Sequence, residues 1–156
     1  MTMSSHVSFE ADEHTLLEDL AFQPHKADPA ALQETYFVFP IRFLMNGVNL
    51  FTTKDGSTLQ LPLIGFSSAL RRGVQQLANS DTCSVYLAGG GQFLLSRRGD
   101  DAIAGFCSIS GVRSSDAYDQ VAAASRQFSE DVSMFLQQEC PELARIEAWP
   151  FWFSEI

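Results

Sequence analysis

The feature that most constrains the fold is an alternating apolar run that ends in a hairpin signal. Within residues 35–45, five apolar residues recur at every second position: Phe37, Phe39, Ile41, Phe43 and Met45. Side chains two residues apart lie on one face of a strand, so the run predicts a β-strand with a buried face. Asn46-Gly47 follows directly and favours a two-residue turn, which predicts a hairpin with a return strand at residues 48–53. Pro40 has no N–H to donate, which predicts an edge strand or a bulge there.

The rest of the chain predicts helices and short strands. Residues 62–78 carry an apolar stripe typical of a helix: Phe66, Leu70, Val74 and Leu77. Residues 83–109 predict a meander of three short strands, with turns at the triple glycine 89–91 and at residues 99–101. A second helix is expected from a cap at Ser114 or Ser115 to Glu139 or Cys140, since Pro141 follows.

This order predicts an α+β fold: an antiparallel sheet of five to six strands with two helices packed on one face. A chain of 156 residues is normally one domain. Residues 1–34 form an atypical N-terminal segment, in which we expect a short strand at 7–11, a helical turn or two at 14–22 and an extended connection at 23–33. Residues 35–113 hold the meander strands and one helix, and residues 114–156 the long helix and an aromatic tail.

The expected location is the cytoplasm. The N-terminus has neither the basic cluster nor the apolar run of a signal peptide, and the longest apolar stretch is too short to span a membrane. Three widely spaced cysteines, Cys83, Cys107 and Cys140, indicate buried free thiols in a reducing compartment.

No pattern in the sequence predicts catalysis, a cofactor or a metal. His6, His14 and His25 are spaced by eight and eleven residues, which matches no zinc motif and indicates exposed loop histidines. The triple glycine precedes a predicted strand, so a turn is favoured over a phosphate-binding loop. The pairs Arg71-Arg72 and Arg97-Arg98 favour surface or structural cations over residues that bind an anionic ligand. Asp100-Asp101 favours a turn over a cation site.

Charge is distributed unevenly along the chain. The net charge is −9, yet residues 35–113 carry seven Lys/Arg against four Asp, so the acidity lies at the two ends. The overall acidity argues against nucleic-acid binding, because phosphate contacts supply most of that affinity. The two acidic ends favour either a surface that meets a basic partner or one that only keeps the chain soluble. Asp116, Asp119 and Glu130 are predicted on the exposed face of the last helix. The candidate partner-binding residues are Asp116, Asp119, Glu130, Asp131, Glu147, Trp149 and Trp152.

The aromatic tail at residues 149–153 has two interpretations. Four large rings within five residues favour packing into the core. Trp is also enriched at interfaces, so a partner contact or a homodimer through the tail stays open.

Several of these segments resemble small bacterial immunity proteins of contact-dependent or polymorphic toxin systems. The resemblance rests on residues 36–42, the Asn46-Gly47 hairpin, residues 61–66 leading into a helix, the meander at 84–108 and Pro141-Glu142-Leu143. It implies a cytoplasmic protein that neutralises a cognate toxin, for which a basic nuclease domain is one candidate, and it implies no catalytic residue. The alternatives are a small α+β ligand-binding or enzymatic domain, in which Arg42, Arg71 or Arg97 would line a pocket, and a structural homodimer.

Overall fold

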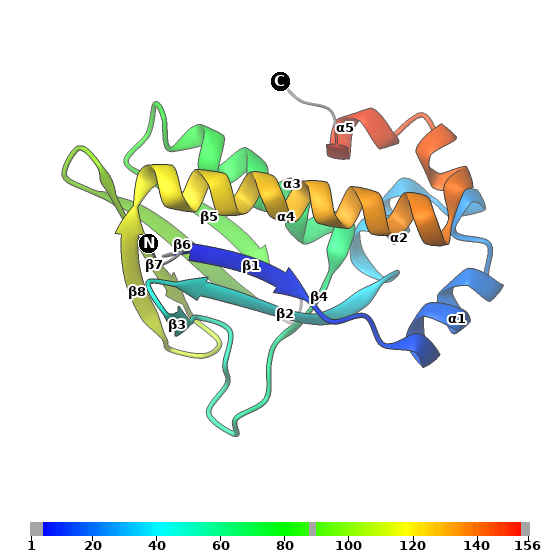
Figure 1. Cartoon of the computed structure of the whole chain (residues 1–156), viewed down its shortest axis with the longest axis horizontal. Helices are drawn as coiled ribbons and strands as arrows, with labels where there is room; N and C mark the ends of the chain where they lie inside the picture. Colours follow the sequence, from blue (N-terminus) through cyan, green and yellow to red (C-terminus); the bar gives the residue numbers. More distant parts are fainter. Residues whose placement is uncertain (1–4, 88–89, 154–156) are drawn as a thin grey trace.

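Two four-stranded antiparallel sheets form the β-structure of the chain, whose computed structural model describes residues 5–87 and 90–153 (Figure 1). In the first sheet β2 (Val38–Met45) pairs with β1 (Ser5–Phe9) on one side and with β3 (Val48–Asn49) and β4 (Gln60–Pro62) on the other. The second sheet is a meander. Its order is β5 (Thr82–Leu87), β6 (Gly91–Arg98), β7 (Ala102–Cys107) and β8 (Arg113–Ala117).

Two long helices lie side by side over these strands. The helix α3 (Leu63–Gln76) packs on β5, and α4 (Tyr118–Glu139) runs along β1 and beside α3 (Figure 1). Shorter helices surround one end of this pair. They are α1 (Glu13–Ala21), α2 (Pro29–Glu34), α5 (Trp149–Phe153) and the 3₁₀ helices η1 (Pro24–Lys26) and η2 (Pro141–Arg145).

The predicted hairpin is confirmed, although its return strand is shorter than expected. Asn46 and Gly47 have φ values of 52° and 81°, as a turn with positive φ at both positions requires. The side chain of Asn49, the last residue of β3, replaces a backbone acceptor at this point. Its Oδ1 accepts hydrogen bonds from the N–H groups of Phe43 at 3.2 Å and Phe51 at 3.1 Å. The N–H of Leu50 still donates to the carbonyl of Phe43 at 2.9 Å, and the side chains of Leu50 and Phe51 are buried in the core.

The prediction of an edge position for the Pro40 strand is wrong, since β2 is the interior strand of its sheet. The Pro40 carbonyl accepts from the N–H of Glu10, and the ladder between β1 and β2 ends just before this point, at Phe9 and Ile41. The position of the N–H that Pro40 lacks therefore faces the side of β2 on which β1 has already ended. A proline is tolerated in an interior strand because its partner strand is short.

Buried apolar side chains form one cluster between the sheets and the long helices. The five alternating residues of the sequence run are all fully buried, as predicted. Phenylalanine rings join the two sheets, with the Phe93 ring 5.0 Å from that of Phe43 and 5.3 Å from that of Phe51. Thus the alternation in β2 determines which face meets the second sheet and the helices.

The predicted α+β class with antiparallel pairing is confirmed, and the finer architecture differs from the prediction. The described residues form two sheets instead of one, because β1, β3 and β4 occupy both sides of β2 and the later meander pairs only with itself. Ser114 and Ser115 lie in β8 and do not cap α4, whose N-cap residue is Ala117. Residues 23–33 are not simply extended, since Pro24 and Pro29 begin η1 and α2.

Candidate functional site

A groove of about 660 Å³ between α3 and α4 brings two of the predicted partner-binding residues together. Asp119 and Glu130 line it from α4, and both side chains are exposed. Arg71 lies on the α3 side, Arg126 on α4, and Phe153 of α5 contributes an aromatic wall. The groove therefore combines both signs of charge with one large ring.

Other predicted residues lie away from this groove. Asp116 belongs to β8, where its Oδ2 accepts a 2.6 Å hydrogen bond from the Ser5 hydroxyl and its Oδ1 accepts one from the N–H of Ala117. The Asp131 carboxylate accepts from the amide of Gln127 one helical turn earlier. Glu147 is exposed between η2 and α5. The prediction that Asp116 projects from the last helix is wrong, because the helix begins two residues later.

The tryptophans of the aromatic tail have different environments. Trp152 is only 2% exposed and belongs to the core cluster, which confirms the core interpretation for this residue. Trp149 is half-buried, with its ring centroid 4.4 Å from that of Phe153. Phe151 is 70% exposed, so it is the ring of α5 most available to a partner.

The paired arginines serve the fold where the structure describes their contacts. Arg71 and Arg72 both donate to the carbonyl of Phe151, at 3.0 and 3.4 Å, which ties α5 to α3. Burial lowers the pKa of Arg71, and the adjacent Arg72 adds to this effect. Arg97 donates to the carbonyls of Leu77 and Asp100, and its guanidinium lies 4.9 Å from the ring centroid of Tyr118.

The predicted turns differ in how far the structure describes them. Residues 99–101 form a turn with Gly99 at φ 72°, as predicted. Of the triple glycine, Gly90 and Gly91 are described and Gly89 lies outside the described residues. Gly90 has a φ of 95° and donates to the carbonyl of Leu87, which fits a hairpin turn.

The histidines do not share one environment, contrary to the prediction of exposed loop positions. His14 is exposed on α1 and pairs with Glu18 one turn later at 2.7 Å. The side chain of His25 in η1 is only 27% exposed, and its Nδ1 lies 3.7 Å from the Glu142 carboxylate. His6 is a half-buried residue of β1.

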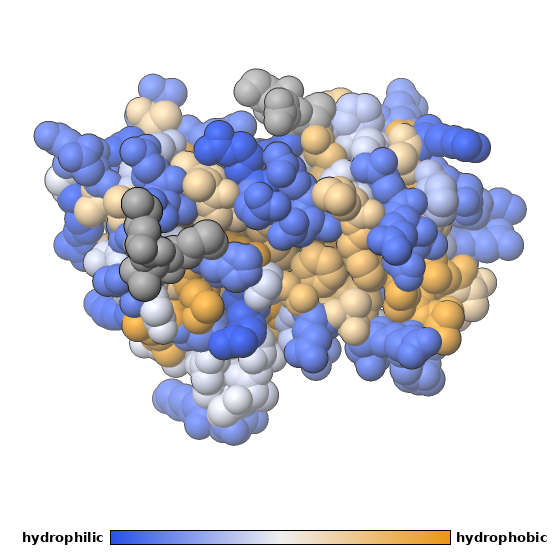
Figure 2. Space-filling view, in the orientation of Figure 1, coloured by the Kyte–Doolittle hydropathy of each residue, from blue (hydrophilic) through white to orange (hydrophobic). Residues whose placement is uncertain are grey.

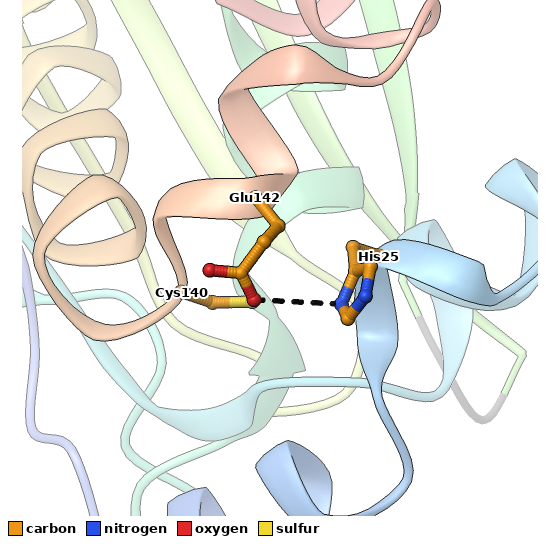
Figure 3. Close-up of side chains that lie close together, drawn as sticks. All are labelled: His25, Cys140 and Glu142. Atoms are coloured by element: carbon orange, nitrogen blue, oxygen red, sulfur yellow. Dashed lines mark ion pairs between the residues drawn. The ribbon is translucent and has the colours of Figure 1, made fainter.

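The structure also places Cys140 beside this His25–Glu142 pair (Figure 3). Residues of η1 and η2 meet there although more than a hundred positions separate them in the sequence. No spacing rule connects such distant residues, so the sequence does not predict this cluster. The only signal available was that each residue type can bind a metal.

All three cysteines are buried and free, as predicted. Burial raises the pKa of Cys83, partly offset by a hydrogen bond from the backbone of Leu95. Burial also raises the pKa of Cys140, and the neighbouring Glu142 carboxylate raises it further. Both thiols therefore favour the protonated form, which is the unreactive one.

No protein-family model matches the chain, and no curated protein or solved structure is significantly similar to it. Within the part of the chain that the structure describes, no helix combines the length and the apolarity needed to cross a membrane.

Proposed function

We propose that this chain is a cytoplasmic immunity-type binding protein that neutralises a cognate toxin domain by covering its active site, without catalysis of its own. The observation that carries the proposal is the excess of acidic over basic side chains. The chain has 19 Asp/Glu against 10 Lys/Arg. In the described part of the chain, the carboxylates of Glu18 and Glu142 lie beside histidines.

An excess of carboxylates is suited to attract a basic partner, because a field dominated by one sign raises association rates by 10 to 10³-fold. Hydrophilic side chains cover much of α4 in Figure 2, and Asp119 and Glu130 of the groove belong to this helix. Met134, 69% exposed, lines the same groove as these acids, and Phe151 of α5 is a further exposed apolar side chain. In the proposed complex the acids steer the encounter and the apolar side chains anchor it.

The deciding experiment is neutralisation in cells. A toxin domain encoded directly upstream of this gene would be expressed alone and together with the full chain, and growth would be followed. We expect the chain to restore growth. Unrelieved toxicity, although both proteins are present at similar levels, would refute the assignment for that toxin.

Charge steering is tested separately by binding kinetics with the same toxin domain. Replacing Asp119 and Glu130 together by Lys should lower the association rate about tenfold at low salt and far less at high salt. Asp81→Lys is the matched control, because it changes charge at an exposed residue outside the groove. If the association rate changes neither with salt concentration nor in the groove variants, electrostatic steering is not part of the mechanism.

A second function is favoured by the position of Arg126 in the groove. A volume of about 660 Å³ is in the range of small-molecule sites. Since Asp119 and Glu130 line the same groove, the best ligand would carry both charges, as an amino acid or a short peptide does. Binding of such ligands, followed by NMR shifts of α4, should disappear in Arg126→Ala. If no zwitterionic ligand perturbs α4, this second function is excluded.

A further inference from the structure

Three potential metal ligands converge where the two 3₁₀ helices meet (Figure 3). The Nδ1 of His25, the Sγ of Cys140 and a carboxylate oxygen of Glu142 all lie within 4.8 Å of one another. Their elements come from opposite ends of the chain, since η1 precedes the first long strand and η2 follows α4. The fold itself therefore assembles the cluster.

Local backbone structure holds each of these residues in place. Pro24 and Pro141 begin the two 3₁₀ helices, and the proline ring presets φ at this position. The N–H of Cys140 donates to Leu136 at 2.7 Å, and its carbonyl accepts from Leu143 at 3.0 Å. Because the backbone on both sides is hydrogen-bonded, little ordering of the chain is needed before a metal binds.

One donor atom of the cluster is buried without a hydrogen bond. The Nδ1 of His25 is inaccessible to solvent and has no hydrogen-bond partner among the described residues, and the nearest carboxylate oxygen is 3.7 Å away. That separation is too long for a hydrogen bond. A buried polar atom in this state costs free energy, and a metal between the nitrogen and the carboxylate would satisfy both.

The ligand types identify the class of metal. Thiolate and imidazole ligands favour zinc over Mg²⁺ and Ca²⁺, which prefer oxygen. Two ligands about 2.0 Å from a tetrahedral zinc lie roughly 3.3 Å apart, so the His25–Glu142 separation needs to close by only a few tenths of an ångström. Glu142 is 51% exposed on its side chain, which leaves a route to solvent and a fourth position for water.

We propose that His25, Cys140 and Glu142 bind a zinc ion that clamps η1 to η2. The ion would join the N-terminal segment to the end of α4 and would serve the fold. Since metal ligands must be deprotonated, the Cys140 thiol releases its proton to solvent as the sulfur–zinc bond forms. This site is independent of the proposed partner-binding groove, because the two have no residue in common.

Zinc and cobalt titrations of the metal-free full chain test the proposal. We expect one zinc per chain and, with Co²⁺, the near-ultraviolet charge-transfer absorption of a thiolate–cobalt bond. Zinc at a hundred times its dissociation constant should raise Tm by roughly 5–10 °C. The absence of both saturable zinc binding and the thiolate absorption would overturn the proposal.

Variants show whether these three residues are the ligands. Cys140→Ser, His25→Ala and Glu142→Gln should each weaken zinc binding at least about tenfold, since even outer-shell changes cost 10- to 100-fold. His14→Ala is the matched control, because His14 also pairs with a glutamate but has no cysteine beside it. Glu142→Gln changes a half-exposed side chain, so it keeps the test valid if Cys140→Ser unfolds. Zinc affinity that survives Glu142→Gln and His25→Ala would refute the site.

Discussion

The Ser5 hydroxyl donates a 2.6 Å hydrogen bond to the carboxylate of Asp116 and so joins β1 to β8 across 111 positions of the sequence. Ser5 is only 2% exposed, and Asp116 is half-buried. A second link runs beside it, from the Ser114 hydroxyl to the carbonyl of Met45. These two bonds connect the sheets at one edge, and they give Asp116 a structural role.

Removal of this link should destabilise the fold. Ser5→Ala is expected to lower the free energy of unfolding by about 1–2 kcal/mol, because the bond is made to a carboxylate. Asp116→Ala should cost at least as much, since it leaves the buried Ser5 hydroxyl without its acceptor. Urea unfolding of both variants, with Ser8→Ala on the same strand as control, measures the effect. A loss no larger than that of Ser8→Ala would contradict the structural role.

Gly65 is required by the contact between α2 and α3. A Cβ at this position would collide with the backbone carbonyl of Gln33, which cannot move aside as a flexible side chain can. Alanine normally improves helix stability over glycine by about 1 kcal/mol. At Gly65 the collision outweighs this gain, so we expect Gly65→Ala to destabilise by about 1–3 kcal/mol in thermal unfolding.

Gly73 provides the matched control for this prediction. It lies in the same helix, and an added Cβ would meet the side-chain sulfur of Cys83 at 3.0 Å. A side chain can yield by a few tenths of an ångström, so Gly73→Ala should cost clearly less than Gly65→Ala. Equal effects at the two positions would show that backbone proximity to Gln33 is not the cause.

The elements predicted correctly from the sequence are those in which a regular hydrophobic pattern extends over many neighbouring residues. The alternation before Asn46 and the apolar stripe of α3 bury the residues that the patterns indicate. Ser114 and Ser115 lie in a strand although their local chemistry favours a helix cap, because the pairing of Ser115 with Ala104 makes them part of β8. The residues adjacent in sequence do not indicate that this segment pairs with a distant strand.

The candidate sites depend on tertiary contacts even more than the strands and helices do, and local sequence does not predict such contacts. Asp119 and Glu130 were identified because they lie on one periodic helix, but the groove between them and Arg71 depends on how α3 packs. His25 and Cys140 meet only after the two ends of the chain have folded together. Contacts of this kind arise from tertiary packing, and the spacing of residues along the sequence does not predict them.

Asp19 should make stability depend on pH in an unusual direction for a carboxylate. Its Oδ2 accepts a 2.8 Å hydrogen bond from the N–H of Phe37, whose φ is +55°, while burial raises the pKa of the carboxyl group. A raised pKa means that the folded state holds the proton more tightly than the unfolded state. The stabilisation from this group is therefore present below pH 3.8, the ordinary value, and is lost as pH rises through the folded-state pKa.

Asp19→Asn tests this sign because it keeps an oxygen acceptor for the Phe37 N–H and removes the charge. We expect the variant to be more stable than the parent at pH 7 by less than about 1 kcal/mol, a small value because the group is largely solvent-screened. The difference should vanish near pH 3. Asp19→Ala, which removes the acceptor, should be less stable at both pH values. Urea unfolding at each pH decides between these outcomes, and a larger benefit of Asn at pH 3 would reverse the argument.

The aromatic tail separates into a structural ring and an exposed one. Trp152 is buried between α5 and the core, so Trp152→Ala should cost about 3–5 kcal/mol, the usual penalty for an emptied aromatic site. Phe151→Ala removes an exposed ring from the same short helix and should change stability by no more than about 0.5 kcal/mol. Thermal unfolding measures both. If Trp152→Ala instead leaves Tm unchanged and abolishes self-association, the tail is an interface and not part of the core.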